Sequence, residues 1–218
     1  MNTRKGLLGF IVLTLFVGLP CVATAQYCAL RQPTVAFQEA FDDETMMRSF
    51  DRQVTEVHRD KIAEVLPFTI HRNELGTHTL YAAIGDGNRV NGYIHVRSER
   101  GKWGLTELAW VLNPDLTVRT LDVQRCRSFS QSYLESGAFQ TLVRDKSIAD
   151  IRSLLVESGT QLHPDVKASV PDDKEALALM AVRSALKTLL ATQLVWEDTL
   201  ASLGYRRAGS IFDGSSVK

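Results

Sequence analysis

Four apolar segments, separated by turn-forming residues, occupy the middle of the chain. They cover residues 80–84, 92–96, 103–112 and 116–123. The connections between them contain Asp-Gly-Asn, Ser-Glu-Arg-Gly and Asn-Pro-Asp, and short connections of this kind join neighbouring strands as antiparallel hairpins. The pattern therefore predicts a central antiparallel sheet with meander topology.

The alternation of apolar and polar residues indicates which strand faces should be buried. In the second segment, Ile94 and Val96 alternate with Tyr93, His95 and Arg97. One face of this strand is therefore expected to pack and the other to meet solvent. The third segment is apolar at both sets of alternate positions, which is typical of a central strand covered on both faces.

Two stretches of irregular alternation refine the predicted sheet. Residues 45–55 alternate unevenly and are consistent with an edge strand. In the fourth segment the alternation slips near Arg119 and Thr120, which predicts a β-bulge at that point.

The segments on either side of the sheet predict helices. Apolar residues at helical spacing indicate short helices over 33–41, 56–66 and 147–157. A long final helix is expected to begin at Ser169, because this hydroxyl can cap it and because proline and acids follow in the first turn. That helix should end near residue 195. Together these elements predict one α+β domain, in which several helices pack on the central sheet.

The N-terminus has the features of a secretory signal peptide over residues 1–25. Arg4 and Lys5 precede an apolar stretch over 6–19, and Ala-Thr-Ala at 23–25 offers a cleavage site. An uncleaved membrane anchor is the alternative, but the apolar stretch is shorter than the roughly 20 residues that a spanning helix needs. The sequence therefore predicts a periplasmic or secreted protein that has no integral membrane span after signal cleavage.

The remaining chain is expected to form one domain over 26–203 and a flexible tail over 204–218, which is rich in glycine and serine. Lysine and arginine together number 25, as do aspartate and glutamate. This balance gives no reason to expect nucleic acid as a partner.

Two cysteines, Cys28 and Cys126, remain after signal cleavage. An even pair in an exported protein predicts a structural disulfide between them. The alternative is two separate thiols, one of which could be a metal or haem ligand.

The order of elements resembles that of a known family. The hairpin YAAIGDGNRVNGYIHV, the strand pair GKWGLTELAWVLNPDLTVRTLDV and the final AVRSALKTLL helix follow one another over roughly residues 45–190. In this order they resemble the FMN-binding domain of periplasmic subunits in the Rnf and Nqr electron-transfer complexes and of the nitrous-oxide reductase regulator. The resemblance implies a flavoprotein that works with a membrane-bound redox or cytochrome complex.

The segment of this chain that corresponds to the family's flavin-attachment motif differs from that motif. The family carries Ser-Gly-Ala-Thr-x-Thr-Ser before the last helix, whereas this chain keeps Ser169 and has Asp172 where the acceptor threonine would stand. Acids at a helix N-terminus repel a phosphate, so covalent flavin is not expected. The resemblance leaves non-covalent FMN, held by Ser169 and flanked by Trp103, Trp110 and Tyr93. The alternative is that these aromatic residues belong to the core.

Other candidate chemistry is sparse, and no catalytic acid and base pair can be assigned. His71, Glu74 and His78, with His95 from the sheet, match no metal motif, so solvated histidines and no metal are expected. The charged stretch 97–102 is expected to be a solvated hairpin end or a docking surface. Two functions follow: an exported accessory or electron carrier of a membrane-associated redox system, or a cofactor-free binding or assembly module.

Overall fold

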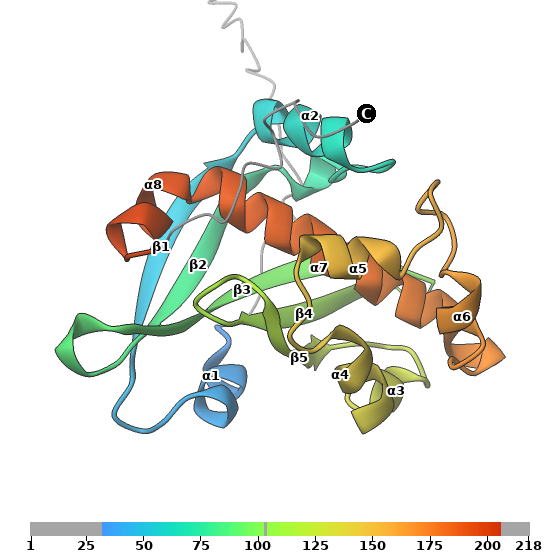
Figure 1. Ribbon diagram of the computed structural model, residues 1–218, viewed down its shortest axis with the longest axis horizontal. Coiled ribbons are helices and arrows are strands. Elements are labelled where there is room, and N and C mark those ends of the chain that lie inside the picture. Colours follow the sequence, from blue (N-terminus) through green and yellow to red (C-terminus); the bar gives the residue numbers. More distant parts are fainter. Residues whose placement is uncertain (1–31, 103, 206–218) are drawn as a thin grey trace, which may run out of the picture.

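The computed structural model describes residues 32–102 and 104–205. Five antiparallel strands form one sheet in the order β1-β2-β3-β4-β5, with helices on both faces (Figure 1). The predicted α+β fold with a central meander is therefore confirmed, and the irregular stretch before the hairpins is its edge strand. The strands are β1 (Met46–Val54), β2 (Gly76–Ile84), β3 (Val90–Gly101), β4 (Gly104–Leu112) and β5 (Val118–Arg125).

The predicted bulge in the last strand is also present. Val111 of β4 pairs with Thr120 of β5, whereas Leu112 pairs with Val118, so Arg119 is the extra residue. The bulge turns this arginine toward the neighbouring loops, where its Nη2 donates to the carbonyl oxygen of Asn91 at 2.8 Å.

Helices lie before and after the sheet. They are α1 (Thr34–Ala40), α2 (Glu56–Val65), α3 (Gln131–Leu134), α4 (Gly137–Val143), α5 (Ile148–Ser153), α6 (Pro164–Lys167), α7 (Glu175–Val195) and α8 (Glu197–Ser202), with the 3-10 turns η1 (Arg72–Glu74), η2 (Asp86–Asn88) and η3 (Asp172–Lys174). The long helix α7 crosses one face of the sheet, and α2 and α5 pack beside it (Figure 1).

Two apolar clusters hold the layers together. The larger one lies between the sheet and α7, where Leu108 and Trp110 of β4 meet Val182, Leu186 and Leu189. The smaller one covers the opposite face of the sheet under α1 and contains Phe41, Ile94, Val96, Ala109 and Val111, among others. β4 is thus buried on both faces, as its composition predicts.

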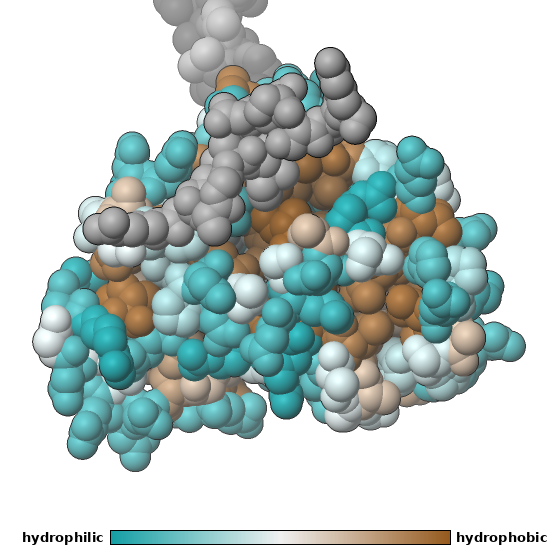
Figure 2. Space-filling view, in the orientation of Figure 1, coloured by the Kyte–Doolittle hydropathy of each residue, from teal (hydrophilic) through white to brown (hydrophobic). Residues whose placement is uncertain are grey.

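Helix α7 passes the length and composition test for a membrane span. The stretch Asp172–Val195 does so with a mean hydropathy of 1.2, but 67% of its apolar window is buried inside the fold. Its packing against β3, α2 and α5 accounts for this apolar composition. In Figure 2 polar surface dominates the visible face, and apolar surface gathers where α5 and α7 lie.

Two expectations are wrong. The face of β3 that should meet solvent is buried, and Tyr93, His95 and Arg97 are each at most 1% exposed, because α7 lies over it. Ser169 does not cap the long helix, because the 3-10 turn Asp172–Lys174 intervenes and α7 begins at Glu175.

Candidate functional site

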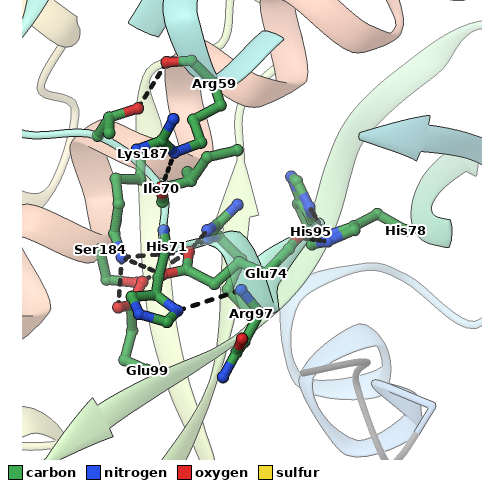
Figure 3. A network of polar contacts seen from close by, with 12 residues as sticks. Arg59, Ile70, His71, Glu74, His78, His95, Arg97, Glu99, Ser184 and Lys187 are labelled. Carbon is green, nitrogen blue, oxygen red and sulfur yellow. Dashed lines mark hydrogen bonds and ion pairs between the residues drawn. The ribbon is translucent and has the colours of Figure 1, made fainter. Parts of the chain in front are cut away.

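Four buried charged residues form the centre of the site. We call Glu74, Arg97, Glu99 and Lys187 the charge cluster; each is at most 7% exposed. Arg97 forms an ion pair with Glu74. Lys187 Nζ lies 3.1 Å from Glu74 Oε1 and 2.5 Å from Glu99 Oε2. Two cations and two anions alternate, so the cluster is neutral as a unit (Figure 3).

Three elements position these side chains. Alternation along β3 places Arg97 and Glu99 on the face under α7, and Lys187 points down from that helix. Glu74 ends the turn η1, where its carboxylate also accepts from the backbone N–H of His71 at 3.0 Å. The 97–102 stretch was expected to be a solvated hairpin end or a docking surface. Its first part is instead buried, because Arg97 and Glu99 form ion pairs inside the fold.

The electrostatics keep Glu74 ionised. Burial by itself raises the pKa of this carboxyl, but the neighbouring charges of Arg97 and Lys187 oppose it, and the resulting pKa is lower than usual. A buried carboxylate held in this way is a structural anchor for two cations at once.

A pair of buried histidines lies beside the charge cluster (Figure 3). His78 Nε2 is 2.7 Å from the carbonyl oxygen of Glu74. A carbonyl only accepts, so this nitrogen carries the proton. His78 Nδ1 then accepts from His95 Nε2 at 3.4 Å, and His95 Nδ1 accepts from the hydroxyl of Thr192 at 2.9 Å. The two rings form one directional chain of hydrogen bonds.

Both rings are neutral at pH 7. Burial, with a smaller effect from Arg97, lowers the pKa of His78 to about 4. Complete burial lowers the pKa of His95 well below its usual value. The expectation that these two histidines are solvated is wrong, although His71 is exposed. Within the described ranges, no group of three histidine, cysteine or acidic residues is arranged to hold a metal ion.

A cleft of about 750 Å³ opens above the charge cluster. We call it the basic cleft, because its lining includes Arg59, Arg72, Arg100 and Arg183 in addition to Lys187. Residues of α2, the loop around η1, the end of β3 and the first half of α7 form its walls. Apolar side chains of α7, Leu179 among them, complete the lining.

The arginines of the basic cleft fall into two kinds. Arg59 and Arg72 both reach Glu56, at 3.3 Å in each case, and their charges are partly neutralised there. In the part of the chain that the structure describes, Arg100 and Arg183 have no ion pair with an acid. Arg183 instead stacks on Phe68, with its Cζ 4.4 Å from the ring centroid. The lining of the cleft thus includes two arginines that have no acid partner among the described residues.

The three described residues that were predicted to bind flavin do not form one site. Tyr93 and Trp110 are at most 1% exposed in the core under α7, and Trp110 Nε1 donates to Ser184 Oγ at 3.1 Å. Ser169 lies at the surface after α6, and its hydroxyl donates to the carbonyl of Val166. None of these three lines the basic cleft. Trp103 lies outside the described residues.

The predicted disulfide also involves a residue outside the described ranges, Cys28. Cys126 is half-buried at the end of β5 and is not in a disulfide with any described residue. Its sulfur accepts from the hydroxyl of Thr106 at 3.7 Å and from the N–H of Ser128 at 3.4 Å. The pairing of the two cysteines stays a prediction, as do the signal peptide and the tail.

Sequence reasoning missed the two basic residues that α7 contributes, Arg183 and Lys187. Both stand in a stretch that was interpreted only by its apolar stripe. The available signal was a lysine among leucines and alanines near the middle of a long apolar helix, because such a residue is buried only when an acid pairs with it.

Comparison with protein-family models, curated proteins and solved structures finds no match to this chain. The resemblance to the FMN-binding domain therefore rests on the sequence alone and stays a prediction.

Proposed function

We propose that this protein is a binding module that holds a small organic anion in the basic cleft. The observation that carries the proposal is that two arginines of the lining, Arg100 and Arg183, have no ion pair with an acid in the described part of the chain. A guanidinium presents a planar fork of donors that matches a carboxylate or a phosphate. The charge cluster on the floor adds no net charge, so the arginines of the lining give the cleft its positive potential.

The dimensions and the lining agree with a ligand site. About 750 Å³ falls within the roughly 300–1,000 Å³ usual for small-molecule pockets. Apolar side chains of Leu179 and Met180 lie alongside the arginines. A ligand with an anionic group and an apolar body fits this combination better than a bare inorganic ion.

The floor favours binding over catalysis. Glu74 and Glu99 face the cleft, but Arg97 and Lys187 hold both carboxylates in ion pairs. The neighbouring cations lower the pKa of Glu74, so this carboxylate is a poor general base.

A non-covalent flavin carrier has less support. Tyr93 and Trp110, which would flank the flavin ring, are enclosed in the core and offer no free face for stacking. The exported location and a membrane-bound redox partner remain predictions from the sequence, and both are compatible with a binding module.

Calorimetric titration with phenyl phosphate tests the proposal. We expect saturable binding, weakened about 10- to 100-fold by Arg183→Gln or Arg100→Gln, because each substitution removes hydrogen bonds between charged groups. Arg48→Gln is the matched control, since Arg48 is an exposed arginine on β1 outside the cleft. Equal affinities in all four proteins, or no saturable binding, would contradict the proposal.

A further inference from the structure

A second cavity of about 390 Å³ lies next to the basic cleft. We call it the Phe129 pocket. It is formed by the end of the β3–β4 hairpin, the segment after β5 and the start of α7, and its apolar lining includes Phe129, Ala176, Leu177 and Met180. Phe129 is 94% exposed. A large aromatic side chain at the mouth of an apolar pocket is a frequent feature of binding surfaces.

The two cavities share one wall. Ala176 and Met180, one turn apart on α7, line both of them. Met180 packs closely on the hairpin, since a Cβ added at Gly101 would lie 3.3 Å from its sulfur. A methionine has three rotatable bonds and adapts readily to a ligand. A change of its rotamer would join the cavities into one groove across the start of α7.

The two ends of the groove differ in charge. Arg100 and Arg183 line the basic cleft and have no ion pair with an acid among the described residues. Asp172, Asp173 and Lys102 line the Phe129 pocket, where Asp173 is also paired with Lys174 Nζ at 2.6 Å. Acidic and basic groups therefore balance at the second end, and an anionic group is attracted to the first. The apolar side chains at the second end suit an uncharged chain.

From this arrangement we infer that the ligand is an anionic amphiphile, a carboxylate or phosphate head on a linear acyl or alkyl chain. The head binds Arg100 and Arg183, and the chain crosses Met180 and enters the Phe129 pocket. This inference rests on the proposed function, because it names the ligand class for the same cleft.

The test is a series of linear carboxylates from butanoate to dodecanoate, titrated calorimetrically. Each methylene that enters the pocket should raise affinity about fourfold, until the pocket is full. Phe129→Ser and Leu177→Asn should flatten this dependence on chain length and leave the affinity for butanoate unchanged. Phe129 is too exposed for its loss to unfold the protein. Leu142→Asn, on the partly buried face of α4, is the control for Leu177→Asn.

The outcomes separate the inference from the proposed function. If phenyl phosphate binds but dodecanoate binds no better than butanoate, the inference of an amphiphilic ligand is refuted. The proposed function as an anion-binding module is then retained. An unchanged dependence on chain length in Phe129→Ser and Leu177→Asn also overturns the inference. If neither phenyl phosphate nor any carboxylate binds, both the inference and the proposed function are refuted.

Sedimentation with phosphatidylglycerol vesicles identifies the source of the amphiphile. Co-sedimentation that both Arg183→Gln and Phe129→Ser abolish supports the inference with a membrane lipid as ligand. Dodecanoate binding without co-sedimentation supports it with a free amphiphile.

Discussion

Removing one member of the charge cluster should destabilise the protein strongly. Lys187→Met keeps an unbranched side chain that is one atom shorter, and it removes the charge. Glu74 then retains Arg97, but Glu99 is left with Arg97 Nε at 3.7 Å as its only cation in the cluster. Both carboxylates are about 93% buried. An uncompensated buried charge costs 3–5 kcal/mol as an order of magnitude, so we expect the free energy of unfolding to fall by about 4 kcal/mol.

A second substitution shows whether the four charges act as one unit. Glu99→Gln alone should cost about 3 kcal/mol, because Lys187 loses its nearest carboxylate. The double variant Glu99→Gln with Lys187→Met is neutral again around the remaining pair of Arg97 and Glu74. We expect it to lose about 3 kcal/mol rather than the sum of about 7, a coupling typical of residues in one ion-pair network.

Urea denaturation at pH 7, followed by circular dichroism, measures these free energies. Lys167→Met is the matched control: its Nζ lies 3.0 Å from Glu175 Oε2, but the lysine side chain is 51% exposed. Such a surface pair should contribute only about 0.5 kcal/mol. A double variant whose loss equals the sum of the single losses within about 0.5 kcal/mol would refute the single-unit interpretation.

Two further predictions concern the buried polar contacts. Because the pKa of His78 in the fold is about 4, against 6.5 for the free side chain, the unfolded chain binds the proton first as the pH falls; the same direction holds for His95. The unfolding free energy should therefore decrease by about 1.6 kcal/mol through His78 between pH 6.5 and 5, and further in the same direction through His95. A flat urea midpoint over this interval would contradict the neutral pair. Ser184→Ala removes the acceptor of the Trp110 indole N–H and should cost about 1–3 kcal/mol by the same assay, whereas Ser184→Thr should retain most of it.

The strands could be predicted because their evidence is local. Turn residues mark the ends of each hairpin, and the slip at Arg119 locates the bulge, all within a few positions of the strands concerned. The same alternation identified the two faces of β3 correctly. It could not show that the polar face is covered, since that depends on α7, almost one hundred residues later in the chain.

The site depends on such distant pairings. Lys187 is separated by 113 positions from Glu74 and by 88 from Glu99. No short window of sequence contains both members of these ion pairs. Glu99 was therefore interpreted as part of a solvated turn, and Lys187 was not singled out from its apolar helix. The wrong prediction that the long helix begins at Ser169 has a local cause instead. The proline and the acids that follow Ser169 are equally compatible with a 3-10 turn, which forms directly after Pro171.

The charge cluster bears on function as well as on stability. Apolar residues of similar volume often stabilise a fold to the same degree as a buried ion-pair network. Stability alone therefore does not explain why a protein contains such a network. This network fixes three separate elements, η1, β3 and α7, to one another at the floor of the basic cleft. Arg100 follows Glu99 on β3, and Arg183 lies one turn before Lys187 on α7. The ion pair between Glu99 and Lys187 therefore restrains the backbone next to the two arginines that we propose bind the ligand. A binding site that is ordered before the ligand arrives loses less entropy on binding.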